Sequence, residues 1–158
     1  WVGDITYVRT WEGWLYLAVL LDLYSRRVVG WAMGPRLTGE LVEQALTRAL
    51  VNRIPRAGLV HHSDRGSQYA ATSYQRRLTE YGLIPSMSRK GNCWDNACVE
   101  SFFGTLKREL VHQRPYVTRD EAKQDIFEYI EVFYNRQRQH STLGYHAPVE
   151  FEARAAVA

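Results

Sequence analysis

Hydrophobic and polar positions follow two different patterns along the chain. In the first quarter, three runs rich in β-branched and aromatic residues cover positions 4–9, 14–23 and 27–33, with short turns near Gly13 and Ser25 between them. Such runs are typical of β-strands. The short connections predict an antiparallel meander.

The apolar spacing then changes to that of helices. Between residues 41 and 50 it recurs every three or four positions, and Thr38 is a candidate N-cap. We further expect a short strand over 58–61, a helix over 70–81 and a brief strand that Pro85 ends.

Two more helices are expected in the second half, after a polar loop over residues 86–92. The first covers about 94–110, and the second begins at a capping box formed by Thr118 and Glu121. The apolar stripe of the second comprises Ala122, Ile126, Tyr129, Ile130 and Phe133. A meander followed by alternating helices and strands predicts an α/β fold, a mixed sheet flanked by helices.

Composition and charge exclude few classes of protein. The chain has 158 residues, 46% of them hydrophobic and 23% charged, which suits one globular domain, 1–158, with a buried core. A net charge of +3 allows a nucleic-acid partner without requiring one. Two cysteines, Cys93 and Cys98, and the lack of a signal-peptide or membrane-spanning pattern predict a cytoplasmic protein with no membrane contact. Because the chain opens on Trp1 rather than Met, we expect a fragment with domains missing upstream.

Three acidic residues stand where elements of such a sheet would converge. Asp4 is on the first expected strand, Asp64 directly follows the fourth, and Glu100 lies inside a helix. Ligand crevices form at strand ends in open α/β sheets. Each residue also has an ordinary explanation, as a strand start, a turn residue or a solvent-facing helix position. Spacing alone leaves both interpretations open.

Carboxylates that meet at one edge repel one another unless a cation neutralises them. Mg²⁺ suits this task because it prefers oxygen ligands and accepts phosphate oxygens. Two ions roughly 4 Å apart stabilise the attacking and leaving oxygens of an in-line displacement. Lys107 shares a helix face with Glu100 and would lie where a DNA backbone passes.

Several segments, in a fixed order along the chain, resemble those of a known protein family. They are Trp1–Tyr7, Leu21–Trp31, His62–Tyr69, Asp95–Lys107 and Tyr134–Tyr145, followed by Pro148 and Glu150–Phe151. Together they resemble the IS-three family of bacterial insertion-sequence transposases, which shares a catalytic core with retroviral integrases. The resemblance extends from Trp1 to about Phe151.

This resemblance implies an RNase H-like fold, with a five-stranded mixed sheet whose first three strands are antiparallel. It maps the three acidic residues of the family onto Asp4, Asp64 and Glu100 as catalytic residues and metal ligands. The gap of 100 − 64 = 36 positions leaves 35 residues between the last two, which is the family's spacing. The family carries a helix-turn-helix region upstream, so recognition of terminal repeats is expected to lie outside this fragment.

The implied activity is that of a DNA transposase. With two Mg²⁺ or Mn²⁺ ions, water cleaves at the 3′ end of the element, and the freed 3′-hydroxyl then attacks another phosphodiester. The resemblance suggests that one end of the element attacks the other end, giving a circular intermediate. The partners are transposon ends and target DNA, and a homo-oligomer is expected in the active complex.

Other polar residues are candidates for DNA contacts: Lys107, Asn96, Arg89, Lys90, Arg138 and His140. For several of them a structural role is equally open, since Asn96 could cap its helix and Arg138 could pair with an acidic residue. Asp22 is interpreted as a turn residue rather than a metal ligand, and His62 as a candidate lining residue beside the active site. The spacing of the histidines and cysteines does not favour a zinc site. Packing is preferred over base stacking for four tryptophans, Trp11, Trp14, Trp31 and Trp94.

Two other functions compete with the transposase hypothesis. An RNase H-like nuclease that only hydrolyses would carry the same acidic residues, and a labelled 3′-hydroxyl donor would distinguish it because only a transferase joins strands. A catalytically silent DNA-binding or assembly module would show no metal binding that depends on Asp64.

Overall fold

The computed structural model describes residues 1–89 and 96–157. Its centre is a five-stranded sheet in the order β3-β2-β1-β4-β5. Strands β1, β2 and β3 form an antiparallel meander, and β4 and β5 add to it in parallel. The strands are β1 (Val2–Thr10), β2 (Gly13–Leu21), β3 (Val28–Gly34), β4 (Val60–Ser63) and β5 (Ile84–Met87). The expected mixed sheet with three antiparallel strands first is confirmed.

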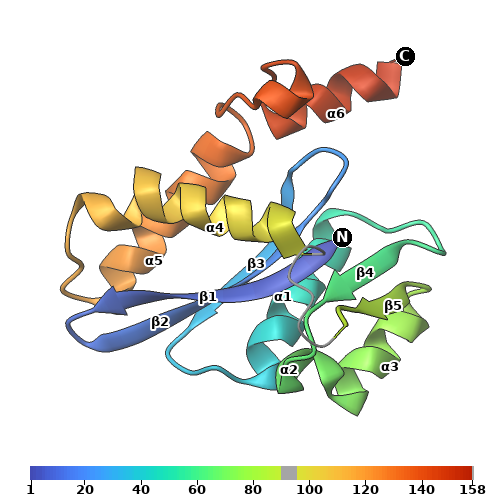
Figure 1. Ribbon diagram of the computed structural model, residues 1–158, viewed down its shortest axis with the longest axis horizontal. Coiled ribbons are helices and arrows are strands. Elements are labelled where there is room, and N and C mark those ends of the chain that lie inside the picture. Colours follow the sequence, from blue (N-terminus) through green and yellow to red (C-terminus); the bar gives the residue numbers. More distant parts are fainter. Residues whose placement is uncertain (90–95, 158) are drawn as a thin grey trace.

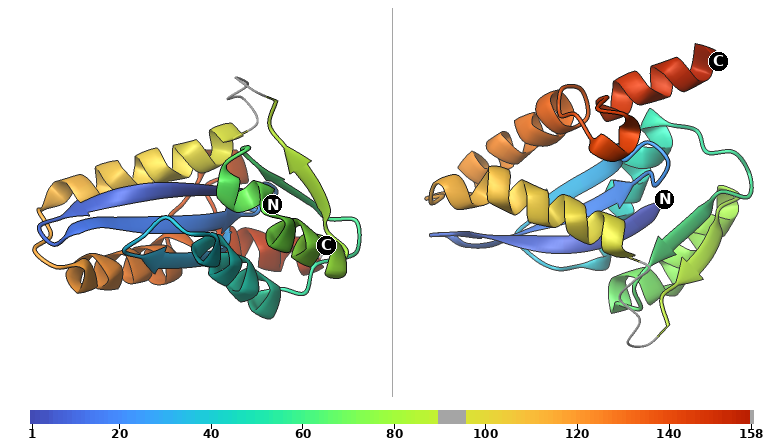
Figure 2. Two further views of the ribbon diagram at one scale, coloured as in Figure 1. Left: turned by 90° about the horizontal axis from the view of Figure 1, so that it is seen from below. Right: turned by 45° about the horizontal axis from the view of Figure 1, so that its top comes forward.

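Helices cover both faces of the sheet. Helices α4 and α5 lie over one face, and α1, α2 and α3 lie over the other (Figure 1). The tip of the β1–β2 hairpin and the β4–β5–α3 segment are at opposite ends of the molecule (Figure 2). The helices are α1 (Gly39–Asn52), α2 (Ser67–Ala70), α3 (Thr72–Glu80), α4 (Ala97–Glu109), α5 (Arg119–Glu128) and α6 (Pro148–Val157), with short turns η2 (Val111–Gln113), η3 (Tyr129–Tyr134) and η4 (Ser141–Leu143).

Each face of the sheet has its own hydrophobic core. On the α4 and α5 side, Val2 and Val8 of β1 pack with Phe102 and Leu106 of α4. On the other side, Leu20 of β2 packs in the cluster formed by α1 and α3. The alternation of side chains along a strand produces this division, because neighbouring residues point to opposite faces.

Helix α5 begins as the sequence predicts. The Thr118 hydroxyl accepts a hydrogen bond from the Glu121 N–H at 3.1 Å, and the Glu121 carboxylate accepts one from the Thr118 N–H at 3.3 Å. The apolar stripe then holds through Ile130, but Phe133 is 39% exposed. The π-helix η3, with its wider turn, breaks the 3.6-residue period that predicted Phe133 as buried.

Other expectations need correction. Pro85 lies inside β5 rather than ending it. Strand β5 is at the edge of the sheet. The Ile84 N–H points toward the sheet and donates to the carbonyl of Leu59, the residue before β4, at 2.8 Å. The nitrogen of the next residue, Pro85, therefore points away from the sheet, where it needs no partner. The helix expected over 70–81 is present as α3, and α2 is a separate short helix before it that was not expected. The helix expected over 94–110 begins, in the described part, at Ala97.

Helix α6 was not expected from the sequence, and a network of ion pairs connects it to the rest of the chain. Glu152 pairs with Arg27 at 2.8 Å and with Arg53, and Arg53 also pairs with Asp22 at 2.7 Å. Asp22 accepts hydrogen bonds from the backbone of the β2–β3 turn as well, as its interpretation as a turn residue requires. In the part of the chain that the structure describes, no helix combines the length and hydrophobicity needed to cross a bilayer.

Candidate active site

Asp4 and Asp64 are brought together by the pairing of β1 with β4. The parallel ladder joins Val2 to His62 and Gly3 to Ser63 and then stops. Asp4 is the next residue of β1, and Asp64 directly follows the end of β4. Both line a small hollow of about 200 Å³ together with Ile5, Tyr7, Tyr16, Leu37, Gln68 and Tyr69. The predicted convergence of these two acids at the sheet edge is therefore observed.

Each carboxylate is positioned by the backbone through one oxygen. Asp4 Oδ1 accepts a hydrogen bond from the Ile5 N–H at 2.8 Å, and Asp64 Oδ1 accepts one from the Gly66 N–H at 2.7 Å. A Cβ at position 66 would lie 2.9 Å from Asp64 Oδ1, so glycine allows this close approach. These bonds orient both carboxylates before any ligand arrives.

The environment of Asp4 disfavours its negative charge. Burial raises the pKa of Asp4 to about 6, with further contributions from the negative charges of Asp64 and Glu100, while the Ile5 N–H opposes the rise. A cation at this position would favour the ionised form instead.

Glu100 lies in the first turn of α4 and is exposed. It is near enough for its charge to act on Asp4. Val99, Phe102 and Leu106 are buried against the sheet, which directs the Glu100 position away from the core. Among residues 1–89 and 96–157, however, no three His, Cys, Asp or Glu side chains are gathered closely enough to hold a metal ion. Asp4 and Asp64 share the hollow, whereas Glu100 is not among its lining residues and acts on Asp4 through its charge.

The adjacent histidines of β4 face opposite sides, as their positions predict. His61 is buried, and its Nε2 is 2.8 Å from the Tyr74 hydroxyl. Burial lowers the pKa of His61 to about 4, so this ring is neutral at physiological pH. His62 contacts the hydroxyls of Ser86 and Ser88 at 2.8 and 3.0 Å. Both rings thus have structural contacts beside the acidic pair.

The residues predicted to contact DNA have varied surroundings. Lys107 is half-buried, and its Nζ lies 5.2 Å from the centre of the Tyr7 ring, at the margin of the acidic hollow. Arg89 is exposed. Asn96 is at the N-cap position of α4 but makes no side-chain cap bond, and its buried Oδ1 has no partner among the described residues. Lys90 lies outside the described residues.

Arg138 and His140, the basic cluster that follows η3, make contacts within the protein. Arg138 donates from Nε and Nη2 to the Glu109 carboxylate at 2.7–3.0 Å, so the structural pairing left open by the sequence is observed. His140 is half-buried, and burial together with the charges of Arg138 and Arg26 lowers its pKa to about 4. At neutral pH this cluster therefore contributes less free positive charge than its sequence suggests.

Some lining residues were not singled out from the sequence. Gln68 and Tyr69 belong to the same segment as Asp64, which could have indicated them. Tyr7 and Tyr16 are paired across β1 and β2, and strand alternation could have placed them on the side of Ile5. The expected packing of the tryptophans holds for Trp31, which is 9% exposed.

The packing expectation is wrong for Trp11, which is 75% exposed at the hairpin turn. Trp14 is 45% exposed and contacts Tyr7 edge-to-face, with ring centres 4.9 Å apart. Trp94 lies outside the described residues.

The integrase core domain family matches residues 1–93 and again residues 100–155. The chain belongs to the integrase core domain family. Its integrase core is 55% identical over 154 residues to the insertion element IS600 uncharacterized 31 kDa protein of Shigella sonnei, covering 98% of the chain and 57% of that protein. It is 50% identical to the transposase for insertion sequence element IS904 of Lactococcus lactis subsp. lactis (strain IL1403), covering 96% and 60%. It is 51% identical to the transposase InsF for insertion sequence IS3A of Escherichia coli (strain K12), covering 96% of the chain and 53% of that protein.

The resemblance to insertion-sequence transposases is thus confirmed, although the chain spans little more than half the length of these relatives. Solved structures confirm the fold of the integrase core. The simian T-cell lymphotropic virus intasome in complex with PP2A regulatory subunit B56 gamma matches with a TM-score of 0.78 at 20% identity, covering 96% of this chain and 52% of that one. The HTLV-2 integrase catalytic core domain in complex with magnesium (trimeric form) matches with a TM-score of 0.72 at 18% identity, covering 96% of this chain and 93% of that one. The RNase H-like fold expected from the sequence is therefore present.

Proposed function

We propose that this chain is the catalytic core of an insertion-sequence transposase that cleaves DNA and transfers the cleaved strand. The observation that carries the proposal is the placement of Asp4 and Asp64 immediately after the last paired residues of two parallel strands, facing one hollow. Glu100, within electrostatic reach of Asp4, would complete an acidic triad. The similarity to named transposases supports the same activity.

The residues present fit divalent metal ions. All three side chains offer carboxylate oxygens, which Mg²⁺ and Mn²⁺ prefer. A bound cation would offset the burial and the neighbouring negative charges that raise the pKa of Asp4. Asp4 and Asp64 would hold the metal, and Glu100 would complete the second of two sites. Bound divalent ions would supply stabilisation of the charge that develops on the phosphate and its attacking and leaving oxygens. The HTLV-2 core, which shares this fold, is named as a complex with magnesium.

The chain's own residues would orient the DNA. Lys107, whose Nζ lies over the Tyr7 ring that lines the acidic hollow, would contact a phosphate next to the reacting one. Arg89, Lys90 and Asn96, which precede or begin α4, are proposed as further contacts. Arg138 and His140 remain predictions of the same kind, although Arg138 would have to share its guanidinium with Glu109.

The proposed reaction has two balanced steps. Water attacks the phosphorus at the 3′ end of the element, and the bond to the 3′ oxygen breaks, which leaves a free 3′-hydroxyl. That hydroxyl then attacks a second phosphodiester and displaces another 3′-hydroxyl, so one phosphorus–oxygen bond replaces another without ATP or a covalent enzyme intermediate. Two DNA ends must be held at once, so we propose a homo-oligomer that acts in the cytoplasm on transposon ends and target DNA.

A strand-transfer assay tests the assignment. The full-length protein is incubated with Mg²⁺ and a duplex carrying its element end and a labelled 3′-hydroxyl, and joined products are separated from cleaved ones. Glu100→Gln should reduce both by at least about a hundredfold, since it removes a charge that acts on the reacting phosphate. Glu80→Gln, an exposed change at the end of α3, is the matched control and should leave activity unchanged.

Two outcomes would contradict the proposal. Wild-type activity in Glu100→Gln would remove the triad. Cleaved products without joined ones, from the full-length wild-type protein, would favour a nuclease that only hydrolyses.

A further inference from the structure

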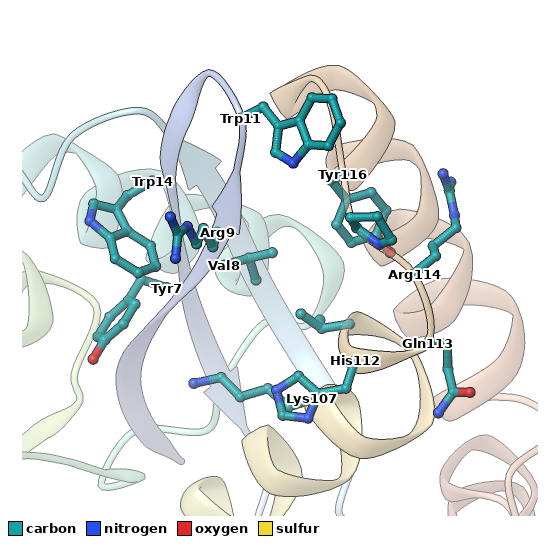
Figure 3. Close-up of a pocket in the computed structure, with 12 residues that line it drawn as sticks. Tyr7, Val8, Arg9, Trp11, Trp14, Lys107, His112, Gln113, Arg114 and Tyr116 are labelled. Atoms are coloured by element: carbon teal, nitrogen blue, oxygen red, sulfur yellow. The ribbon is translucent and has the colours of Figure 1, made fainter.

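A second hollow lies beside the acidic one, between the tip of the β1–β2 hairpin and the connection from α4 to α5. Its volume is about 610 Å³. We call it the hairpin groove, and its principal lining residues are Tyr7, Arg9, Trp11, Trp14, Lys107 and Tyr116. In Figure 3, Arg9 lies between the Tyr7–Trp14 pair and the side chains of Trp11 and Tyr116.

Backbone contacts hold the two walls of the hairpin groove together. The Trp11 N–H donates to the Tyr116 carbonyl at 3.0 Å, and Thr10 forms a parallel bridge with Tyr116. Arg119 donates from Nε to the Trp14 carbonyl at 3.0 Å. The groove is therefore formed before any ligand binds, which lowers the entropic cost of binding.

Large aromatic rings are exposed at the groove, and the edge-to-face contact between Tyr7 and Trp14 leaves both of these rings partly open to solvent. Trp11 is 75% exposed, Tyr7 54% and Trp14 45%. Exposed aromatic side chains gathered around one groove are typical of a binding surface. Flat rings beside cations are the elements with which proteins bind single-stranded nucleic acid, since every base offers a face for stacking.

The charge of the hairpin groove has the sign that a phosphate backbone requires. Arg9 and Lys107 line it, and none of its described lining residues is Asp or Glu. Arg114 also lines it but is paired with Asp125 at 2.8 Å and lies over the Tyr116 ring, so we do not assign it to a ligand. Arg9 and Lys107 are the candidate phosphate contacts.

The hairpin groove adjoins the candidate active site. Tyr7 lines both hollows, and Lys107, whose Nζ lies above the Tyr7 ring, belongs to the same helix as Glu100. A strand that passes from the acidic hollow over Tyr7 would reach the groove.

From these observations, and resting on the proposed function, we propose that the hairpin groove binds unpaired nucleotides of a DNA strand next to the reacting phosphate. Bases stack on Trp11 and Trp14, and Arg9 and Lys107 contact the phosphates. The occupant is single-stranded because the faces of a base inside a duplex are covered by its neighbours, whereas an unpaired base can stack on an exposed ring.

Binding of a fluorescein-labelled oligothymidylate of roughly a dozen nucleotides tests this proposal. Anisotropy is measured with the present chain in EDTA, so that the result does not depend on metal or on catalysis. Trp11→Ala should weaken binding about tenfold or more, as expected for the loss of one stacked base, and Trp11→Phe should restore most of it. Tyr81→Ala removes a ring that is 50% exposed at the end of α3, away from the groove, and should leave affinity unchanged.

The variants can be compared because the Trp11 side chain is exposed and its backbone bond to Tyr116 does not involve the ring. Equal melting temperatures would verify this point. The proposal is overturned if Trp11→Ala binds the oligonucleotide as wild type does, or if a duplex of the same length binds more tightly than the single strand. Weak binding of both nucleic acids would also overturn it and would favour a protein partner. Because metal-dependent strand transfer is measured separately, failure here leaves the proposed function intact.

Discussion

Replacing Asp4 by Asn should stabilise the folded chain at neutral pH while removing its response to metal. Burial and the charges of Asp64 and Glu100 raise the pKa of Asp4 from 3.8 to about 6. The folded state therefore holds the proton more tightly than the unfolded state. The stability that this provides is fully present below about pH 4 and is lost as the pH rises through about 6.

The magnitude follows from the two pKa values. They differ by about 2, and each pKa unit corresponds to about 1.4 kcal/mol, which sets an upper limit of about 3 kcal/mol. Because Asp4 is only half-buried, solvent screens its charge and we expect about 1–2 kcal/mol. Asparagine keeps an oxygen that can accept the Ile5 N–H and carries no charge. The variant should gain this amount over wild type at about pH 8 and none at about pH 4.

Urea unfolding followed by circular dichroism at several pH values measures the difference. Asp120→Asn is the control, because its carboxylate is 95% exposed and already solvated, and it should show no comparable change. Millimolar Mg²⁺ should stabilise wild type but not Asp4→Asn, by about 1.4 kcal/mol when the free metal is about ten times the dissociation constant. If Asp4→Asn is no more stable than wild type at about pH 8, or if its advantage does not change with pH, the electrostatic argument is wrong.

Two further predictions concern the fold. A Cβ on Gly30 would lie 2.3 Å from the Ala45 carbonyl oxygen, so Gly30→Ala should separate α1 from β3 and lower the free energy of unfolding, measured in urea, by at least about 2 kcal/mol. Gly104→Ala, in open space on α4, should raise that free energy by up to about 1 kcal/mol, and equal values for the two variants would contradict the packing argument. The buried Asn135 side chain accepts a hydrogen bond from the Val28 N–H and donates one to the Val28 carbonyl, both at 3.0 Å. Asn135→Ala should therefore lower the free energy of unfolding by about 2–3 kcal/mol in the same assay. A loss under about 1 kcal/mol would show that water replaces the amide.

The order of elements could be predicted from local patterns because each pattern has a local cause. Strand alternation, helical spacing and the capping box at Thr118 depend on residues close together in the chain. The errors arose where neighbours in space decide. Pro85 is accepted within β5 only because its strand is at the sheet edge, and Phe133 is exposed because η3 departs from the α-helical period.

The candidate site could be predicted in part for the same reason. The family resemblance indicated Asp4 and Asp64, but they meet because β4 pairs in parallel with the start of β1, and no local pattern sets that pairing. The pairing of Arg138 with Glu109 brings together residues 29 positions apart, and no local pattern distinguishes it from a free basic cluster. The exposure of Trp11 likewise depends on how the hairpin meets the segment at Tyr116.

The brevity of the ladder between β1 and β4 has a mechanical consequence. Only two residue pairs, Val2 with His62 and Gly3 with Ser63, make up that ladder, and the acidic residues follow at once on either side of this seam. A small rotation of β4 and β5 relative to the meander would change the gap between the two carboxylates directly. A ligand that bridges the two carboxylates would connect β4 and β5 to the meander at this short ladder. Binding at the site would therefore also restrict motion between the two parts of the sheet.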